Sequence, residues 1–202
     1  TVNINNNTAT ASTVACAYLE SNALSFNFIS GTYTLTFLGT AGYSAGSVNF
    51  TGFSGTWAAT STGTLYGNLI LSSAMTLTTS ASAMTLGGTS GTKTITSNGE
   101  SIPFPITVNG AGATWQLLDA FTLATTTTAF THTNGTFDLN GFTATVGTYA
   151  TGSGTKNLTF NGGVLSVIGS GATAFNNAQP TNYTTTAGTG TGYIRLNSST
   201  AK

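Results

Sequence analysis

The clearest pattern in the chain is a period-two alternation of apolar and polar residues between positions 24 and 37. The apolar positions form two groups of three, namely Leu24, Phe26 and Phe28, followed by Tyr33, Leu35 and Phe37. Because successive side chains of a β-strand point to opposite faces, each group places its three side chains on one side. Ser30 and Gly31, between the groups, are typical of a turn. The pattern therefore predicts a β-hairpin with one apolar face.

A looser repeat begins near residue 46, where a glycine opens a short strand-like segment at widening intervals. The markers are Gly46, Gly67, Gly91, Gly112, Gly135, Gly162 and Gly192. Further short strands are expected between them, at residues 74–77, 105–108, 121–123, 142–146 and 158–160. Two or three short strands in about two dozen residues fit one coil of a parallel β-solenoid, in which like strands stack.

We therefore predict an all-β chain, with an N-terminal hairpin and assembly segment over residues 1–45 and a β-solenoid-like stack over residues 46–202. Its 45 threonines and 26 glycines, against 3 prolines, agree with short strands joined by tight turns. The same pattern also fits an antiparallel β-sandwich or jelly roll, which is the alternative fold.

Charge is nearly absent, because four Lys and Arg residues balance four Asp and Glu residues. Without a basic field we expect no nucleic-acid partner and no membrane-surface partner. No apolar run approaches the roughly 20 residues of a membrane helix. The single cysteine, Cys16, has no intrachain partner and is expected to be a small buried hydrophobe.

Three acidic residues, Glu100, Asp119 and Asp138, are spaced 19 residues apart, which suggests paired carboxylates on one solenoid face. A coil of 21 to 24 residues, however, sets each successive acid out of register with the last. Asp138 lies between Phe137 and Leu139, so it is expected to point to solvent when they point inward. We therefore expect isolated, solvated acids.

His132 is the other candidate for chemistry, either with Asp119 and Asp138 as metal ligands or with Asp138 in a serine triad. A metal site needs clustered His, Cys or acidic ligands, and a triad needs a defined nucleophile such as that of GxSxG, which is missing. We therefore predict a protein that is not an enzyme, with no cofactor and no metal. Asp119, Asp138 and His132 are the residues to test against this prediction.

Aromatic residues have two interpretations. Trp57 and Trp115 are expected to pack in the core, since large aromatic side chains are mostly buried. Tyr149, Tyr183 and Tyr193 are candidates for a contact surface, including one that stacks on sugars.

Residues 131–163 contain the runs NGTFDLNG, from Asn134 to Gly141, and TVGTY, from Thr145 to Tyr149. This stretch resembles repetitive Thr/Gly/Asn-rich structural proteins of bacteriophages, marine phages in particular. The resemblance implies β-structure with a virion or tail-associated role, and it carries no catalytic motif. Bacterial surface adhesins use similar strings.

An assembly subunit is accordingly the expected function, as a homo-oligomer such as a trimer or as a polymer on a virion or outside the cell. Solenoid ends expose unpaired backbone groups, which neighbouring chains or an added strand from residues 1–7 would cover. Other virion proteins and host-surface glycans are further candidate partners. The alternatives are a bacterial extracellular filament or adhesin, and a glycan-binding or depolymerase β-helix protein.

Overall fold

The computed structural model describes residues 2–5, 12–15, 25–38 and 43–197 and is nearly all β. Every strand pair among these residues is parallel. The chain is therefore a parallel β-solenoid, as predicted, and the antiparallel alternative is wrong. None of the helices in this part of the chain has the length and apolar character needed to cross a membrane.

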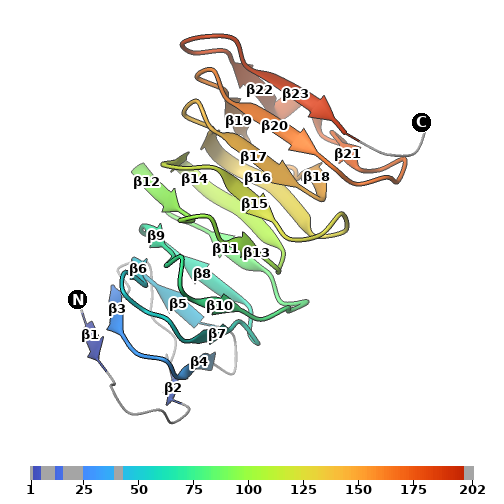
Figure 1. The fold of residues 1–202 in the computed structure, drawn as a ribbon. Helices are drawn as coiled ribbons and strands as arrows, with labels where there is room; N and C mark the ends of the chain where they lie inside the picture. The colour runs from blue at the N-terminus through green and yellow to red at the C-terminus, as the bar shows by residue number, and fades with distance from the viewer. Residues whose placement is uncertain (1, 6–11, 16–24, 39–42, 198–202) are drawn as a thin grey trace.

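Consecutive strands pass through three faces, and each passage makes one coil (Figure 1). The first face stacks β1 (Val2–Asn5), β3 (Phe26–Ser30), β6 (Val48–Asn49), β9 (Leu69–Ile70), β12 (Gly91–Thr96), β14 (Ile106–Leu117), β16 (Ala129–Asp138), β19 (Lys156–Thr159) and β22 (Tyr183–Thr186). The second face carries β2 (Ser12–Ala15), β4 (Thr34–Leu38), β7 (Thr56–Ala58) and β10 (Thr76–Leu77), then β13 (Ser101–Ile102), β15 (Phe121–Leu123), β17 (Thr143–Val146), β20 (Val164–Val167) and β23 (Tyr193–Leu196). The third face carries β5 (Tyr43–Ala45), β8 (Gly63–Leu65), β11 (Met84–Leu86), β18 (Thr148–Thr151) and β21 (Phe175–Asn176). A 3-10 helix, Pro180–Asn182, precedes β22.

β14 and β16 turn a corner and belong to both the first and the third face. The start of β14 pairs with β11 and its end with β12, which joins the two faces into one 14-stranded sheet. Gly135 forms this corner in β16 with a φ of 84°. A Cβ added there would lie 2.1 Å from the Gly110 carbonyl oxygen, so only glycine fits between these coils.

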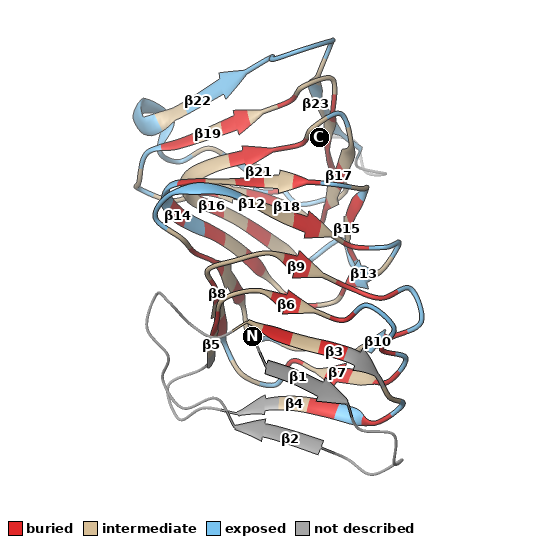
Figure 2. Cartoon of the chain, turned by 90° about the vertical axis from the view of Figure 1, so that its left-hand side faces the viewer, coloured by how far each residue is buried: buried red, intermediate tan, exposed pale blue. Residues whose placement is uncertain are grey.

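Side chains of alternate residues fill the interior, which Figure 2 shows as buried positions along the strands. Near the N-terminal end, Phe28 stacks on Phe50 at 4.9 Å, and Phe50 contacts Trp57 at 5.1 Å, both between ring centroids. Near the C-terminal end, Phe130 lies 4.8 Å from Phe137. Trp57 and Trp115 are both fully buried, so their predicted place in the core is confirmed.

The predicted hairpin is wrong in its pairing, although both of its strands exist. β3 pairs with β1 and β6, whereas β4 pairs with β2 and β7 on another face. Residues 30 and 31 therefore mark a corner of a coil. Four of the predicted inward side chains are buried as expected, namely Phe26, Phe28, Tyr33 and Leu35. Leu24 and the side chain of Phe37 lie outside the described part of the chain, as does Cys16.

The N-terminal strands belong to the same sheet as the rest of the first face. β3 pairs with β6 across the boundary expected at residues 45 and 46. β1 pairs with β3 of its own chain, so the segment expected as a donated strand lies in its own sheet.

Five of the seven glycine markers lead into stacked strands of the first face, from β6 to β16. Gly162 and Gly192 instead precede β20 and β23 on the second face. The spacing widened because the last two markers belong to a different face. The last coil is also longer, since Asn157 pairs with Thr184, 27 residues further along.

Candidate functional site

The C-terminal coil is an open end of the solenoid. Among the described residues, β21, β22 and β23 each pair on one edge only, with β18, β19 and β20 respectively. The amide of Phe160 donates to the Thr186 carbonyl, so Thr186 faces β19 and the backbone of Thr185 faces away. Much of this coil is exposed in Figure 2.

Apolar side chains lie uncovered on this end. Tyr193 and Leu196 of β23 are each 50% exposed, and Ile194 between them packs against the core. The charged residue of this strand, Arg195, donates hydrogen bonds from Nε and Nη2 to the Ser166 hydroxyl at 3.3 and 3.2 Å. The open edge thus combines unpaired backbone groups, apolar side chains and little charge.

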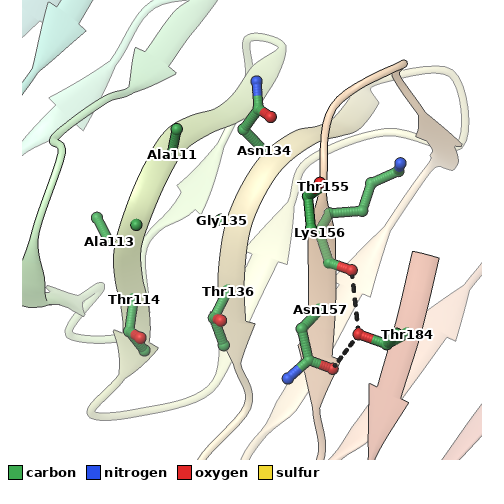
Figure 3. Close-up of a pocket in the computed structure, with 11 residues that line it drawn as sticks. Ala111, Ala113, Thr114, Asn134, Gly135, Thr136, Thr155, Lys156, Asn157 and Thr184 are labelled. Atoms are coloured by element: carbon green, nitrogen blue, oxygen red, sulfur yellow. Dashed lines mark hydrogen bonds between the residues drawn. The ribbon is translucent and has the colours of Figure 1, made fainter. Parts of the chain in front are cut away.

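A groove of about 390 Å³ crosses the outer surface at the corner of β14, β16, β19 and β22 (Figure 3). We call it the axial groove. Its lining residues are mostly small or neutral polar, namely Ala111, Gly112, Ala113, Thr114, Asn134, Gly135, Thr136, Thr155, Lys156, Asn157 and Thr184. Thr184 closes one end by donating to the Asn157 side-chain oxygen and to the Lys156 carbonyl at 3.2 and 3.3 Å.

Behind this corner, the interior contains a polar cluster around His132. The His132 Nδ1 atom lies 2.9 Å from the Tyr149 hydroxyl, and Nε2 lies 3.0 Å from the Gly135 carbonyl oxygen. Because a carbonyl only accepts, Nε2 carries the proton and Nδ1 accepts from Tyr149. The Tyr149 and Tyr183 hydroxyls are 3.4 Å apart.

Lys156 completes the cluster, since its side chain is 1% exposed and Nζ donates to the Gly154 carbonyl at 2.6 Å. Burial lowers the pKa of His132 to about 4, and the nearby charge of Lys156 also lowers it. Burial lowers the pKa of Lys156 as well and raises that of Tyr149. The cluster is inside the core, so it stabilises the fold and does not face a substrate.

The two candidate acids, Asp119 and Asp138, are not brought together. Gln116 is the register partner of Asp138, and Asp119 lies three residues beyond Gln116. Asp119 accepts hydrogen bonds from the Ser97 amide at 2.8 Å and from its hydroxyl at 3.0 Å. It therefore caps the corner between β12 and β13.

The expectation that Asp138 points freely to solvent is wrong, because the residue is only 7% exposed. Its carboxylate accepts hydrogen bonds at 2.9 Å from the Gln116 and Asn161 side chains, which lie on neighbouring coils, and from the Asn140 amide. Stacking neighbours cover it from both sides. In the described part of the chain, no three His, Cys, Asp or Glu residues are grouped to hold a metal ion.

The tyrosines proposed for a contact surface separate into three environments. Tyr149 is fully buried, so its assignment to a surface is wrong, since its ring stacks on Phe130 and Phe175 in the core. Tyr183 is half-buried and Tyr193 is exposed. The buried state of Lys156 was missed, although it alternates in phase with Leu158 in the sequence.

No family model matches the chain, and neither a curated protein nor a solved structure matches it. The open end, the axial groove and the polar cluster are therefore the features from which a function can be proposed.

Proposed function

We propose that this protein is a structural assembly subunit whose copies join through their solenoid ends, and that it serves as a virion or tail-associated component of a bacteriophage. The phage assignment draws on the resemblance of residues 131–163 described above. The assembly role draws on the open C-terminal coil.

The observation that carries the proposal is the unpaired edge of β22 and β23. Natural proteins protect such edges with charge, proline, a bulge or a covering element. Here the edge offers backbone donors and acceptors beside exposed Tyr193 and Leu196, and the one cation on β23 is hydrogen-bonded to Ser166. A partner strand would satisfy the backbone groups and cover the apolar side chains.

The opposite end supplies a matching edge. In the described part of the chain, β1 pairs only with β3, and β2 pairs only with β4. Joining the two unlike ends head to tail is a heterologous contact, which builds rings or open filaments. A formal net charge of +0 leaves little repulsion between copies.

The test uses Thr185→Pro, because Pro removes the outward amide of β22 without removing a bond to β19. Thr185→Val is the matched control, since it keeps this amide and the β-branched shape. We expect the native chain and the Val variant to associate at micromolar concentration in analytical ultracentrifugation. The Pro variant should associate at least about ten-fold more weakly, a loss of roughly 1.4 kcal/mol.

Circular dichroism of both variants checks that the β-fold is retained. Deletion of residues 1–12 removes the edge at the other end and should weaken association in the same way. A native chain that stays monomeric, or a Pro variant that associates as tightly as the Val variant, would contradict the proposal.

A further inference from the structure

We propose that the axial groove is a binding site for a neutral polysaccharide, whose chain lies along the solenoid axis across β14, β16, β19 and β22. The site lies within one chain, so it does not rest on the assembly proposed above.

The groove repeats with the coils. Thr114, Thr136, Asn157 and Thr184 form a row, because each is the register partner of the next. Neighbouring strands are about 4.8 Å apart, so the three steps of this row extend for about 14 Å. A linear polymer of repeating units fits such a row better than a compact ligand.

The two sides of the groove present hydrogen-bonding groups over a small-residue floor. Figure 3 shows Asn134 and Thr155 toward one end of the groove, with Thr136 and Thr114 further along the strands. Gly112 and Gly135, between these groups, have no side chain to fill the space.

Several of these groups are unused by the protein. Within the part of the chain that the structure describes, the hydroxyls of Thr114, Thr136 and Thr155 form no hydrogen bond. Asn134 donates its Nδ2 to the Asn109 side-chain oxygen at 2.7 Å, which leaves its own Oδ1 as an acceptor. β-Branching restricts the threonine rotamers, so their hydroxyls are held in place for a ligand.

The charge of the lining excludes anionic ligands. Lys156 is the one charged residue among those that line the groove, and its ammonium group is directed to the Gly154 and Asn182 carbonyls. With the residue 1% exposed, its charge is not offered to a phosphate or a uronic acid.

A peptide is also a poor fit. β14, β16 and β19 are paired on both edges, so none of them can accept an added strand here. The lining contains no aromatic ring and no deep apolar pocket for a side-chain anchor. Hydroxyl and amide groups without charge are suited to a polyhydroxylated, uncharged chain.

The experiment is saturation-transfer difference NMR with the full chain and three neutral probes, cellotriose, laminaritriose and maltotriose. Trigalacturonic acid is the charged probe of matched length. We expect saturable binding of at least one neutral trisaccharide with a dissociation constant of about 1 mM, as hydrogen bonds in an open groove give weak affinity. Thr136→Val should weaken it about three- to ten-fold, because the variant keeps the shape and loses the hydroxyl.

Thr131→Val is the matched control, since Thr131 is on the third-face part of the same strand, outside the groove, and should leave binding unchanged. The proposal is overturned if no neutral probe binds at millimolar concentration, if Thr136→Val has no effect, or if the charged probe binds more tightly. Deletion of residues 1–12 separates the two proposals, because it should weaken assembly and leave sugar binding intact.

Discussion

Two buried tyrosines show how differently the two ends of the core treat polar atoms. Tyr33, near the N-terminal end, packs edge-on against Phe53, and its buried hydroxyl has no hydrogen-bond partner. Tyr149, near the C-terminal end, stacks on Phe130, and its hydroxyl donates to His132. The coil scaffold is the same in both places, but only the C-terminal end brings polar side chains from several coils to one point.

This difference divides the core into an aromatic end and a polar end. The aromatic end centres on Phe50, with Phe28, Phe53 and Trp57 around it. The polar end holds His132, Tyr149, Lys156 and Tyr183 in register-related positions. Burying a histidine and a lysine costs solvation, so the polar end should respond to pH and the aromatic end should not.

The largest expected effect is acid destabilisation of the polar end. The pKa of His132 is about 4 in the folded chain and about 6.5 when unfolded, so the unfolded state binds the proton first as the pH falls. Stability is therefore unaffected by His132 above pH 6.5 and is lost between pH 6.5 and 4. The loss approaches about 3 kcal/mol, measured as the free energy of unfolding in urea at each pH.

His132→Gln is the matched variant, because an amide can donate to Gly135 and accept from Tyr149 without titrating. Its stability should fall less between pH 6.5 and 4 than that of the native chain, by about the same 3 kcal/mol. Identical pH profiles for the two proteins would show that His132 does not carry the difference between the two ends.

The next effect tests the hydrogen bond at the polar end. Tyr149→Phe removes the donor to His132 Nδ1 and leaves that buried acceptor unpaired. We expect a loss of about 2 kcal/mol in the free energy of unfolding at pH 7. A change below about 0.5 kcal/mol would mean that the Tyr149 hydroxyl contributes nothing to the cluster.

The same substitution at the aromatic end should have the opposite sign. Tyr33→Phe removes a buried hydroxyl without a partner, so we expect the free energy of unfolding to rise by up to about 1 kcal/mol. Thermal unfolding of the two Phe variants side by side gives the comparison directly. Destabilisation by Tyr33→Phe would contradict the assignment of an unpaired hydroxyl.

The sequence was most informative about strands and inward positions. Alternation identified the buried positions of β3 and β4, and the segment expected at 121–123 is strand β15. It did not identify their partners, because period two fixes which side a residue faces but not which strand lies beside it. Treating residues 30 and 31 as a hairpin turn therefore gave the wrong pairing.

The environment of each polar residue depended on the coils above and below it. Asp138 was expected at the surface on the basis of its own strand, and it is covered by Gln116 and Asn161 from adjacent coils. His132 and Tyr149 are 17 residues apart and meet only because β16 and β18 pair in register. Such contacts need the length of each coil, which varies along this chain.

The central claim is that neighbouring coils stack in parallel and in register, and a disulfide between two outward positions tests it most directly. In a Cys16→Ala background, Thr107→Cys and Thr131→Cys place two thiols on register partners of β14 and β16. Strands about 4.8 Å apart suit a disulfide, whereas Thr107→Cys with Ala129→Cys is offset by two residues, about 8 Å, and does not. We expect rapid oxidation of the first pair alone, measured by thiol titration and non-reducing mass spectrometry. Oxidation of the offset pair, or free thiols in the register pair, would contradict the parallel stack.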